Sequence, residues 1–272
     1  GNNGGSVAFT YMKNWQNLDQ SSNSSYLTAN YLLPKDKMGL GVNAIYEQTN
    51  NFNLTNLALG GSYNFNIWED YLITLGLTAE YFSISGTSSD FFVRDPNDPV
   101  LLNEYRNGGV DFSTGILLNT KYFELGAAYL NLNAGNINSF YEATFVAQAK
   151  SFFSILNNRG IIEPSVIYRR PATLKATLDA MVHFTYKSQF LVGLNYRTDA
   201  VLGATVGFIQ DHRFVIAYTL RSGGTQELLT AGMNHEIGIR YNLNKQYFKL
   251  KDPEHNEPNQ SYTYRKKGFE KN

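Results

Sequence analysis

The feature that most constrains this chain is a series of long segments in which apolar and polar side chains alternate. From Leu174 to Tyr186 every second residue is apolar or aromatic, and the positions between are mostly polar. A period of two over such a length predicts a β-strand with two chemically different faces. The same pattern predicts fourteen strands, over residues 6–15, 25–34, 37–48, 53–66, 70–86, 109–119, 122–133, 142–152, 160–170, 172–186, 188–198, 200–210, 213–222 and 231–243.

The length of these segments favours a membrane protein. Strands of soluble proteins centre on about five to six residues, whereas strands that cross a bilayer at a tilt need about nine to eleven. In hydrocarbon every backbone N–H and C=O must be paired within the protein, and a closed barrel achieves this. We therefore expect an all-β fold, a transmembrane antiparallel β-barrel of about 14 strands over residues 1–243, followed by a polar tail over 244–272.

The connections between the predicted strands differ in length. Short turns are expected at 34–37, 119–121, 186–188 and 210–213, and longer polar loops at 16–24, 48–53, 86–108, 133–141 and 221–231. Short turns at one end and long loops at the other are typical of outer-membrane barrels. The pattern is imperfect, because the turns near Arg170-Pro171 and Thr198-Asp199 are short and the segment 153–159 is long.

Composition excludes several classes of function. Lys plus Arg and Asp plus Glu both number 23, so there is no net charge to attract nucleic acid. The absence of cysteine excludes disulfides, thiolate metal sites and cysteine nucleophiles. No run of 18 apolar residues could form a transmembrane helix. A mean hydropathy of −0.32 is still compatible with a barrel, because only every second residue of its wall is apolar.

The two faces of the predicted strands differ in charge. The outward face carries aromatic residues suited to the headgroup level of a bilayer, namely Tyr71, Tyr81, Phe184, Tyr186, Tyr196, Phe208, Tyr218 and Tyr241. The inward face is assigned Glu80, Asp111, Glu124, Glu163, Arg169, Asp179, His183, Asn195, Arg197, Glu236 and Arg240. A soluble β-sandwich, the alternative fold, could not bury so many ionisable groups without strong pairing. Whether the barrel lumen is open or filled stays undecided at this stage.

No pattern of residues predicts chemistry. The sequence has no G-x-S-x-G, P-loop or H-E-x-x-H motif, and its four histidines, at 183, 212, 235 and 255, lack the spacing of a metal site. A barrel hydrolase would need a Ser–His or Asp–His arrangement, for which Ser222 and His235 can be nominated, but their proximity cannot be read from sequence. We predict no enzyme, no catalytic or metal-binding residue and no cofactor.

A set of segments in the second half resembles the PorP/SprF family of type IX secretion system membrane proteins from Bacteroidota. The resemblance rests on their order along the chain more than on any one of them. The segments are Pro164-Ser165 with Tyr168-Arg169, Tyr196-Arg197 with Asp199-Ala200, Gly207 with Arg213, and His235-Glu236-Ile237 with Tyr241. Family members usually carry an Asn-Pro-rich segment ahead of a strand like Tyr11–Trp15, which this sequence lacks, and the polar tail extends past the usual last strand.

The resemblance implies an outer-membrane barrel whose termini lie in the periplasm. It implies a component of the type IX secretion or gliding apparatus that contacts the lipid bilayer. Its protein partners would be the periplasmic ring, the outer-membrane translocon or a secreted adhesin. The tail 244–272 and the loop 86–108 are the expected contacts. A substrate-specific channel for small solutes, with the charged lumen residues as its filter, and a soluble sandwich adhesin are the alternatives.

Overall fold

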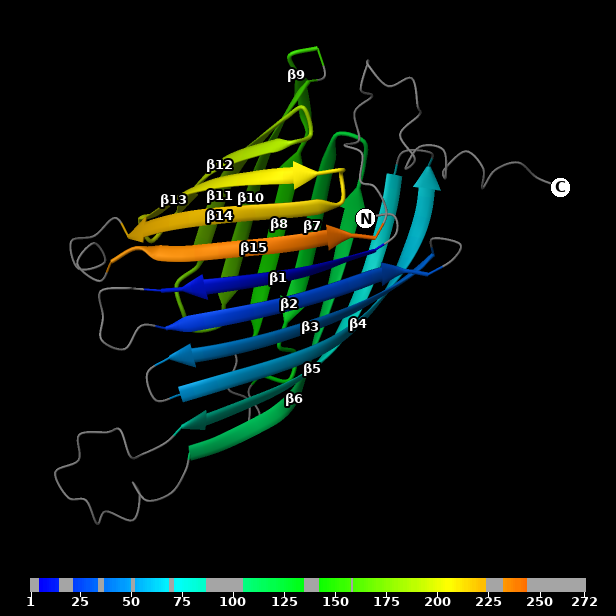
Figure 1. Ribbon diagram of the computed structural model, residues 1–272. Coiled ribbons are helices and arrows are strands. Elements are labelled where there is room, and N and C mark those ends of the chain that lie inside the picture. Colours follow the sequence, from blue (N-terminus) through cyan, green and yellow to red (C-terminus); the bar gives the residue numbers. More distant parts are fainter. Residues whose placement is uncertain are drawn as a thin grey trace.

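In the computed structural model, the described residues form β-strands and no helix (Figure 1). The structure describes residues 5–14, 22–33, 37–49, 52–68, 71–86, 105–134, 142–157, 159–223 and 232–243. No helix among these residues has the length and apolar character to cross a membrane. The strands are β1 (Gly5–Lys13), β2 (Asn23–Leu32), β3 (Met38–Thr49), β4 (Phe52–Trp68), β5 (Tyr71–Gly86), β6 (Tyr105–Asn119), β7 (Phe123–Leu130), β8 (Thr144–Ser151), β9 (Phe153–Ile155), β10 (Gly160–Pro171), β11 (Thr177–Tyr186), β12 (Phe190–Arg197), β13 (Val201–Gln210), β14 (Phe214–Gly223) and β15 (Asn234–Asn242).

The strands form one antiparallel sheet that closes on itself. Successive strands are neighbours throughout, β1 also pairs with β15, and β10 joins β8 to β11. The short β9 adds to β10 beside the end of β8. A closed sheet has no bare edge along its main wall, so the backbone groups of its strands pair with one another. The predicted antiparallel barrel of about 14 strands is confirmed, with β9 as an extra strand that the sequence did not indicate.

Most strand ends lie within about two residues of the sequence pattern, and four of the larger differences have an identifiable cause. β6 begins at Tyr105 instead of residue 109, because its pairing with β5 continues to Gly86. β7 ends at Leu130, and Asn131 follows with a φ of 58° that takes the chain out of the extended region. The predicted strand 172–186 begins only at Thr177. The Thr173 backbone amide donates a hydrogen bond to the Glu142 carboxylate instead of pairing with a neighbouring strand. Phe153–Ile155, expected to be part of a turn, forms β9.

Two ends of the barrel can be distinguished by their connections. At the turn-side end, Lys187-Ser188 and Asp211-His212 all have positive φ, and both turns close with a 3.0 Å backbone hydrogen bond. Two consecutive residues of positive φ match the twist of a tight hairpin. Gly5 and Leu243 also meet at this end, where the Leu243 amide donates to the Gly5 carbonyl at 2.9 Å. At the opposite, loop-side end, β1 ends at Lys13, β5 at Gly86 and β14 at Gly223.

The distribution of apolar side chains is inverted relative to a soluble protein. Among the described residues, the buried apolar side chains are few, namely Ala58, Phe82, Ile84, Ile161 and Ile209. Large apolar side chains instead cover the outer surface of every long strand, for example Leu77 at 68% and Leu194 at 69% exposure. An exposed apolar surface of this extent is typical of contact with lipid. The aromatic residues predicted to face outward include Tyr81, Tyr196 and Tyr218, which are all exposed.

Candidate functional site: the charged inner wall

The charged residues selected from the sequence lie on the face opposite the exposed apolar side chains. Tyr81 and Val110 are exposed on the outer surface, so their strand neighbours Glu80 and Asp111 point the other way. The same parity holds on the other strands that carry the selected residues, Glu124, Glu163, Arg169, Asp179, His183, Asn195, Arg197, Glu236 and Arg240. The inner wall of the barrel is therefore polar, whereas its outer wall is apolar.

One group of these residues is closely paired on β10, β11 and β12. The Arg169 guanidinium donates through Nη1 to Asp179 Oδ2. Arg197 Nε lies 3.2 Å from Asp179 Oδ1 and 3.5 Å from Asp199 Oδ1. The Asp179 side chain is only 18% exposed, whereas the Arg169 and Arg197 side chains are 43% and 39% exposed, so solvent screens these contacts in part. Asp179 thus balances two guanidinium groups from neighbouring strands near the loop-side end.

A second ion pair lies toward the turn-side end. Lys150 Nζ on β8 is 3.0 Å from Glu163 Oε1 on β10, and Glu163 is the cross-strand partner of His183. The backbone position opposite His183 is Gly193, where a Cβ would lie 2.3 Å from His183 Cδ2. Glycine at 193 therefore leaves the space that the imidazole fills. We call Lys150, Glu163, Arg169, Asp179 and Arg197 the ion-paired wall.

The inner wall also contains polar partners that the sequence reading missed. Glu236 pairs with Arg221 at 2.7 Å, and the Tyr26 hydroxyl donates to Glu47 at 2.7 Å. Period two along residues 37–48 places Glu47 inward, so this pair could have been found. Lys150 was missed because the alternation of its strand is weak, and Arg221 because it lies where the strand meets a loop.

Glu80 and Asp111 are arranged differently from the ion-paired wall. They are cross-strand partners on β5 and β6, and neither forms an ion pair with a described residue. Glu80 accepts hydrogen bonds from the Ser113 hydroxyl at 2.6 Å and the Asn56 amide at 3.3 Å. Asp111 is 1% exposed, and its Oδ2 is buried without a hydrogen-bond partner. We call these two residues the carboxylate pair.

Two further selected residues, Glu124 and Arg240, also lie on the inner wall. Glu124 accepts a hydrogen bond from the Asn119 amide at 3.1 Å, and its cross-strand partner on β8 is Lys150. Arg240 lies between Ala8 and Val215 on the neighbouring strands, and its Nε is buried without a hydrogen-bond partner. The structure does not bring Arg240 to any of the carboxylates described above.

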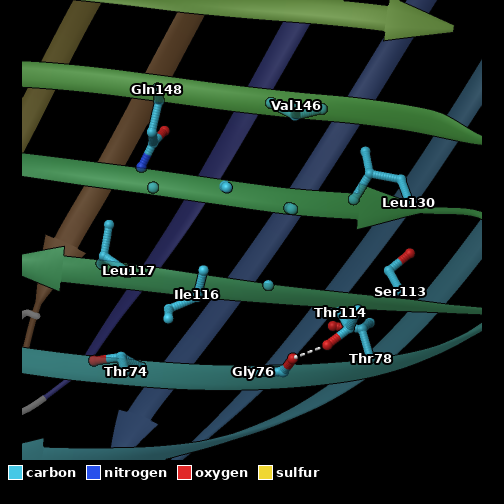
Figure 2. A pocket seen from close by; sticks show the side chains of 14 residues that line it. Thr74, Gly76, Thr78, Ser113, Thr114, Ile116, Leu117, Leu130, Val146 and Gln148 are labelled. Atoms are coloured by element: carbon cyan, nitrogen blue, oxygen red, sulfur yellow. Dashed lines mark hydrogen bonds between the residues drawn. The ribbon is translucent and has the colours of Figure 1, made fainter.

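A cavity of about 330 Å³ lies against the inner wall of β5 to β8 (Figure 2). Its lining combines small residues such as Gly76, Gly115 and Ala128 with the hydroxyls of Thr78 and Ser113. A Cβ added at Gly76 would meet nothing closer than 3.9 Å, which shows open space beside this part of the wall. The cavity can hold a small group or several waters, and most of its lining is apolar.

The structure brings no catalytic constellation together among the described residues. The Tyr218 hydroxyl and His235 Nδ1 are 2.6 Å apart, whereas the Ser222 hydroxyl donates to the Gly223 carbonyl. Ser222 and His235 therefore do not form the nucleophile and base of a hydrolase in this geometry. Within the described ranges, no three His, Asp or Glu side chains are close enough to hold a metal ion.

Comparison with known proteins gives a family match and several fold matches. A family model described as type IX secretion system membrane protein PorP/SprF matches residues 1–241. No curated protein sequence matches the chain significantly.

Three solved structures illustrate the likeness in fold. The outer membrane protein Omp33 of Acinetobacter baumannii has a TM-score of 0.54 at 7% identity, over 89% of this chain and 99% of that one. The CymD monoaromatic hydrocarbon channel has a TM-score of 0.54 at 13% identity, over 88% and 87%. The toluene transporter TodX of P. putida has a TM-score of 0.51 at 9% identity, over 88% and 90%. At these identities the likeness concerns the barrel fold alone.

Proposed function

This chain belongs to the PorP/SprF family of type IX secretion system membrane proteins, and we propose that it binds protein partners within that apparatus instead of conducting solutes. Its place as an outer-membrane component of type IX secretion follows from the family. The observation that carries the proposal is the extent of the match, which covers residues 1–241 and so every strand of the barrel except the last residue of β15. The partners we propose are other secretion or gliding proteins, such as a periplasmic ring or a translocon, or a secreted surface adhesin.

Several charged side chains of the inner wall are paired with one another. This pairing supports a role in stabilising the barrel more than a role in selecting ions. Asp179 is engaged by Arg169 and Arg197, and Glu163 by Lys150. Charges held in pairs across neighbouring strands stiffen the wall and leave less free charge for a passing ion. We also propose that the chain catalyses no reaction, since no nucleophile and base meet among the described residues.

We propose that both termini face the periplasm. Ser6 at the start of β1 pairs with Asn242 at the end of β15, so the two ends of the barrel wall lie at the same, turn-side end. Short turns face the periplasm in outer-membrane barrels, and the long loops face outside. The segments 244–272 and 87–104 lie outside the described residues, and we propose them as contacts on the two sides of the membrane.

A substrate-specific channel is the second candidate, because the cavity of about 330 Å³ on the inner wall is the size of a small ligand. Conductance of the purified chain in planar bilayers separates the two functions. Stable open-channel current would support the channel. Electrical silence, together with loss of type IX secretion or gliding on deletion of the protein, supports the protein-binding role. If deletion leaves both processes intact, the proposed function is wrong.

Capture of binding partners by the protein with and without residues 244–272 tests whether the tail contributes to partner binding. The proposal expects secretion-system proteins to be lost from the capture when the tail is removed. Unchanged partners would restrict binding to the barrel and its loops. Protease cleavage of a tag at the C-terminus in intact cells tests the orientation, because a periplasmic terminus is protected until the outer membrane is opened.

A further inference from the structure

The outer surface of the barrel separates positive from negative charge. Every Asp and Glu on the described strands faces the lumen. Of the strand lysines and arginines whose side chains the structure describes, Lys13 and Arg170 lie on the outer face, and both are exposed. β1 ends at Lys13 and β10 ends at Pro171, so both cations lie at the loop-side end. Positive charge on this face is therefore not balanced by a carboxylate of the described strands.

Lys13 belongs to a row of polar side chains that crosses three neighbouring strands. Its cross-strand partners are His235 on β15 and Asn23 on β2, and Figure 1 shows these strands side by side. Residues directly opposite each other in an antiparallel pair have Cβ atoms about 4.5–5.5 Å apart. His235 has the parity of the exposed Ile237, and Asn23 has the parity of the exposed Leu27, so both point outward with Lys13. We call His235, Lys13 and Asn23 the outer polar row.

Two exposed tyrosines, each two residues nearer the middle of the barrel wall, contact the ends of the outer polar row. The Tyr11 hydroxyl donates to Asn23 Oδ1 at 3.1 Å, and the Tyr218 hydroxyl lies 2.6 Å from His235 Nδ1. Because its oxygen is engaged, the Asn23 side chain presents its amide N–H donors beside the Lys13 ammonium group. Neither Asn23 Nδ2 nor Lys13 Nζ has an acceptor among the described residues. Two such donors, one of them charged, suit an anion with several oxygens.

The surface on the membrane side of the outer polar row is apolar. Phe9 on β1, Leu27 on β2 and Ile237 on β15 are all exposed. An acyl chain can lie along these side chains, whereas a free inorganic anion gains nothing from them. Tyrosine rings between apolar and polar surface are typical of the headgroup level of a bilayer. An anion joined to acyl chains therefore matches more of this surface than an anion alone.

We propose that the outer polar row binds the phosphate group of a membrane lipid, in the leaflet at the loop-side end, through the Lys13 ammonium and the Asn23 amide. Phosphate oxygens accept hydrogen bonds from both donors, and the charged donor strengthens the contact. The attraction of Lys13 for the phosphate is not opposed by a carboxylate of the described strands on this face. The acyl chains of the lipid pack on Phe9, Leu27 and Ile237. The site goes beyond the proposed function, because it needs no protein partner.

The test uses the full chain purified in a neutral detergent, with native mass spectrometry to count bound lipid. The probes are dioleoyl phosphatidic acid and dioleoylglycerol, which share their acyl chains and differ in the phosphate. We expect phosphatidic acid to bind at least about fivefold more tightly than dioleoylglycerol. An excess of inorganic phosphate, which lacks acyl chains, should not displace the lipid.

Three variants test the contact with the phosphate. Lys13→Gln should remove most of the preference for phosphatidic acid, because the charged donor is lost. Asn23→Asp keeps the size of the side chain but places a carboxylate beside Lys13, so it should abolish the preference. Arg170→Gln is the matched control, since it removes the other outer cation at the same end, where Phe145 is the cross-strand partner. The control should leave the preference unchanged, and heat-modifiable migration on gels confirms that each variant is folded.

Four results would overturn the proposal. The first is equal binding of the two lipids by the unaltered protein, and the second is a preference that survives in folded Lys13→Gln. The third is displacement of the lipid by inorganic phosphate, which would make the row a site for free anions. The fourth is an equal loss of preference in Arg170→Gln, which would show that any cation at this end attracts the phosphate. None of these results depends on secretion or gliding, so failure of the lipid site is distinguishable from failure of the proposed function.

Discussion

The ion-paired wall and the carboxylate pair are built from the same kinds of residues but balance their charge differently. Asp179 lies between two arginines from neighbouring strands. Asp111 is more deeply buried, at 1% exposure, yet it faces Glu80 and has no ion pair among the described residues. The difference teaches that burial of a carboxylate in this barrel does not by itself imply a counter-charge. One region stabilises the closed barrel, and the other is incomplete within the described part of the chain.

The largest expected effect is at the centre of the ion-paired wall. Asp179→Asn leaves Arg169 and Arg197 close together with no carboxylate between them, which should lower the free energy of unfolding by roughly 2–4 kcal/mol. Urea-induced unfolding in phospholipid vesicles measures the loss. Lys175→Gln, which removes a charge four residues before Asp179 in the sequence and has no described contact to it, is the control. A loss below about 0.5 kcal/mol would mean that the pairing contributes no more than an exposed salt bridge.

Replacing glycine with alanine should have different effects on stability at Gly193, where the His183 imidazole fills the space, and at Gly76, which lines the cavity. Gly193→Ala places a Cβ 2.3 Å from His183 Cδ2, so the imidazole must move, at a cost of about 1–2 kcal/mol. Gly76→Ala points into the cavity and should change stability by less than about 0.5 kcal/mol. The same unfolding measurement applies to both. Recovery of stability in Gly193→Ala with His183→Ala would confirm the clash, and a cost at Gly76 above that at Gly193 would contradict it.

Replacing aspartate with asparagine, which should destabilise the ion-paired wall, should have only a small effect on stability in the carboxylate pair. Asp111→Asn keeps an oxygen that can accept the Phe112 and Asn133 amides and removes a like charge beside Glu80. The free energy of unfolding should therefore change by less than about 1 kcal/mol, in either direction. Side-by-side urea unfolding of Asp111→Asn and Asp179→Asn measures the contrast. Equal losses would show that Asp111 has a counter-charge in the folded barrel.

The smallest effect concerns Glu142, which lies in the connection before β8. Hydrogen bonds from the Thr173 hydroxyl and then from the Thr173 backbone amide hold the pKa of this carboxyl below its usual range. A lowered pKa means that the contact stabilises the fold above the ordinary carboxyl pKa and is lost as pH falls through the lowered value. Titration of Glu142 by NMR should show its pKa rising toward the ordinary value in Thr173→Ala. An unchanged pKa would exclude the contact as its cause.

Most of the fold could be predicted from the sequence because each long strand carries its own signal. Leu178, Val182 and Tyr186 alternate with polar residues over a length that suits a tilted membrane strand, and no distant part of the chain is needed to read this pattern. The segment 142–152 alternates less clearly than the other predicted strands, and it forms β8 over Thr144–Ser151 with Lys150 inward. β9 could not be predicted, because three residues are too few to show a period.

The sequence by itself determined the barrel, its family and which side chains of each strand share a face, since these depend on local alternation and on ordered motifs. Only the tertiary structure decided which charges meet. Register places Arg169 beside Asp179 but Glu80 beside Asp111, and it leaves β6 longer than β7. The physical reason is that the period of a strand sets the face of a residue, whereas its partner depends on the alignment of two strands, which separate parts of the chain fix together.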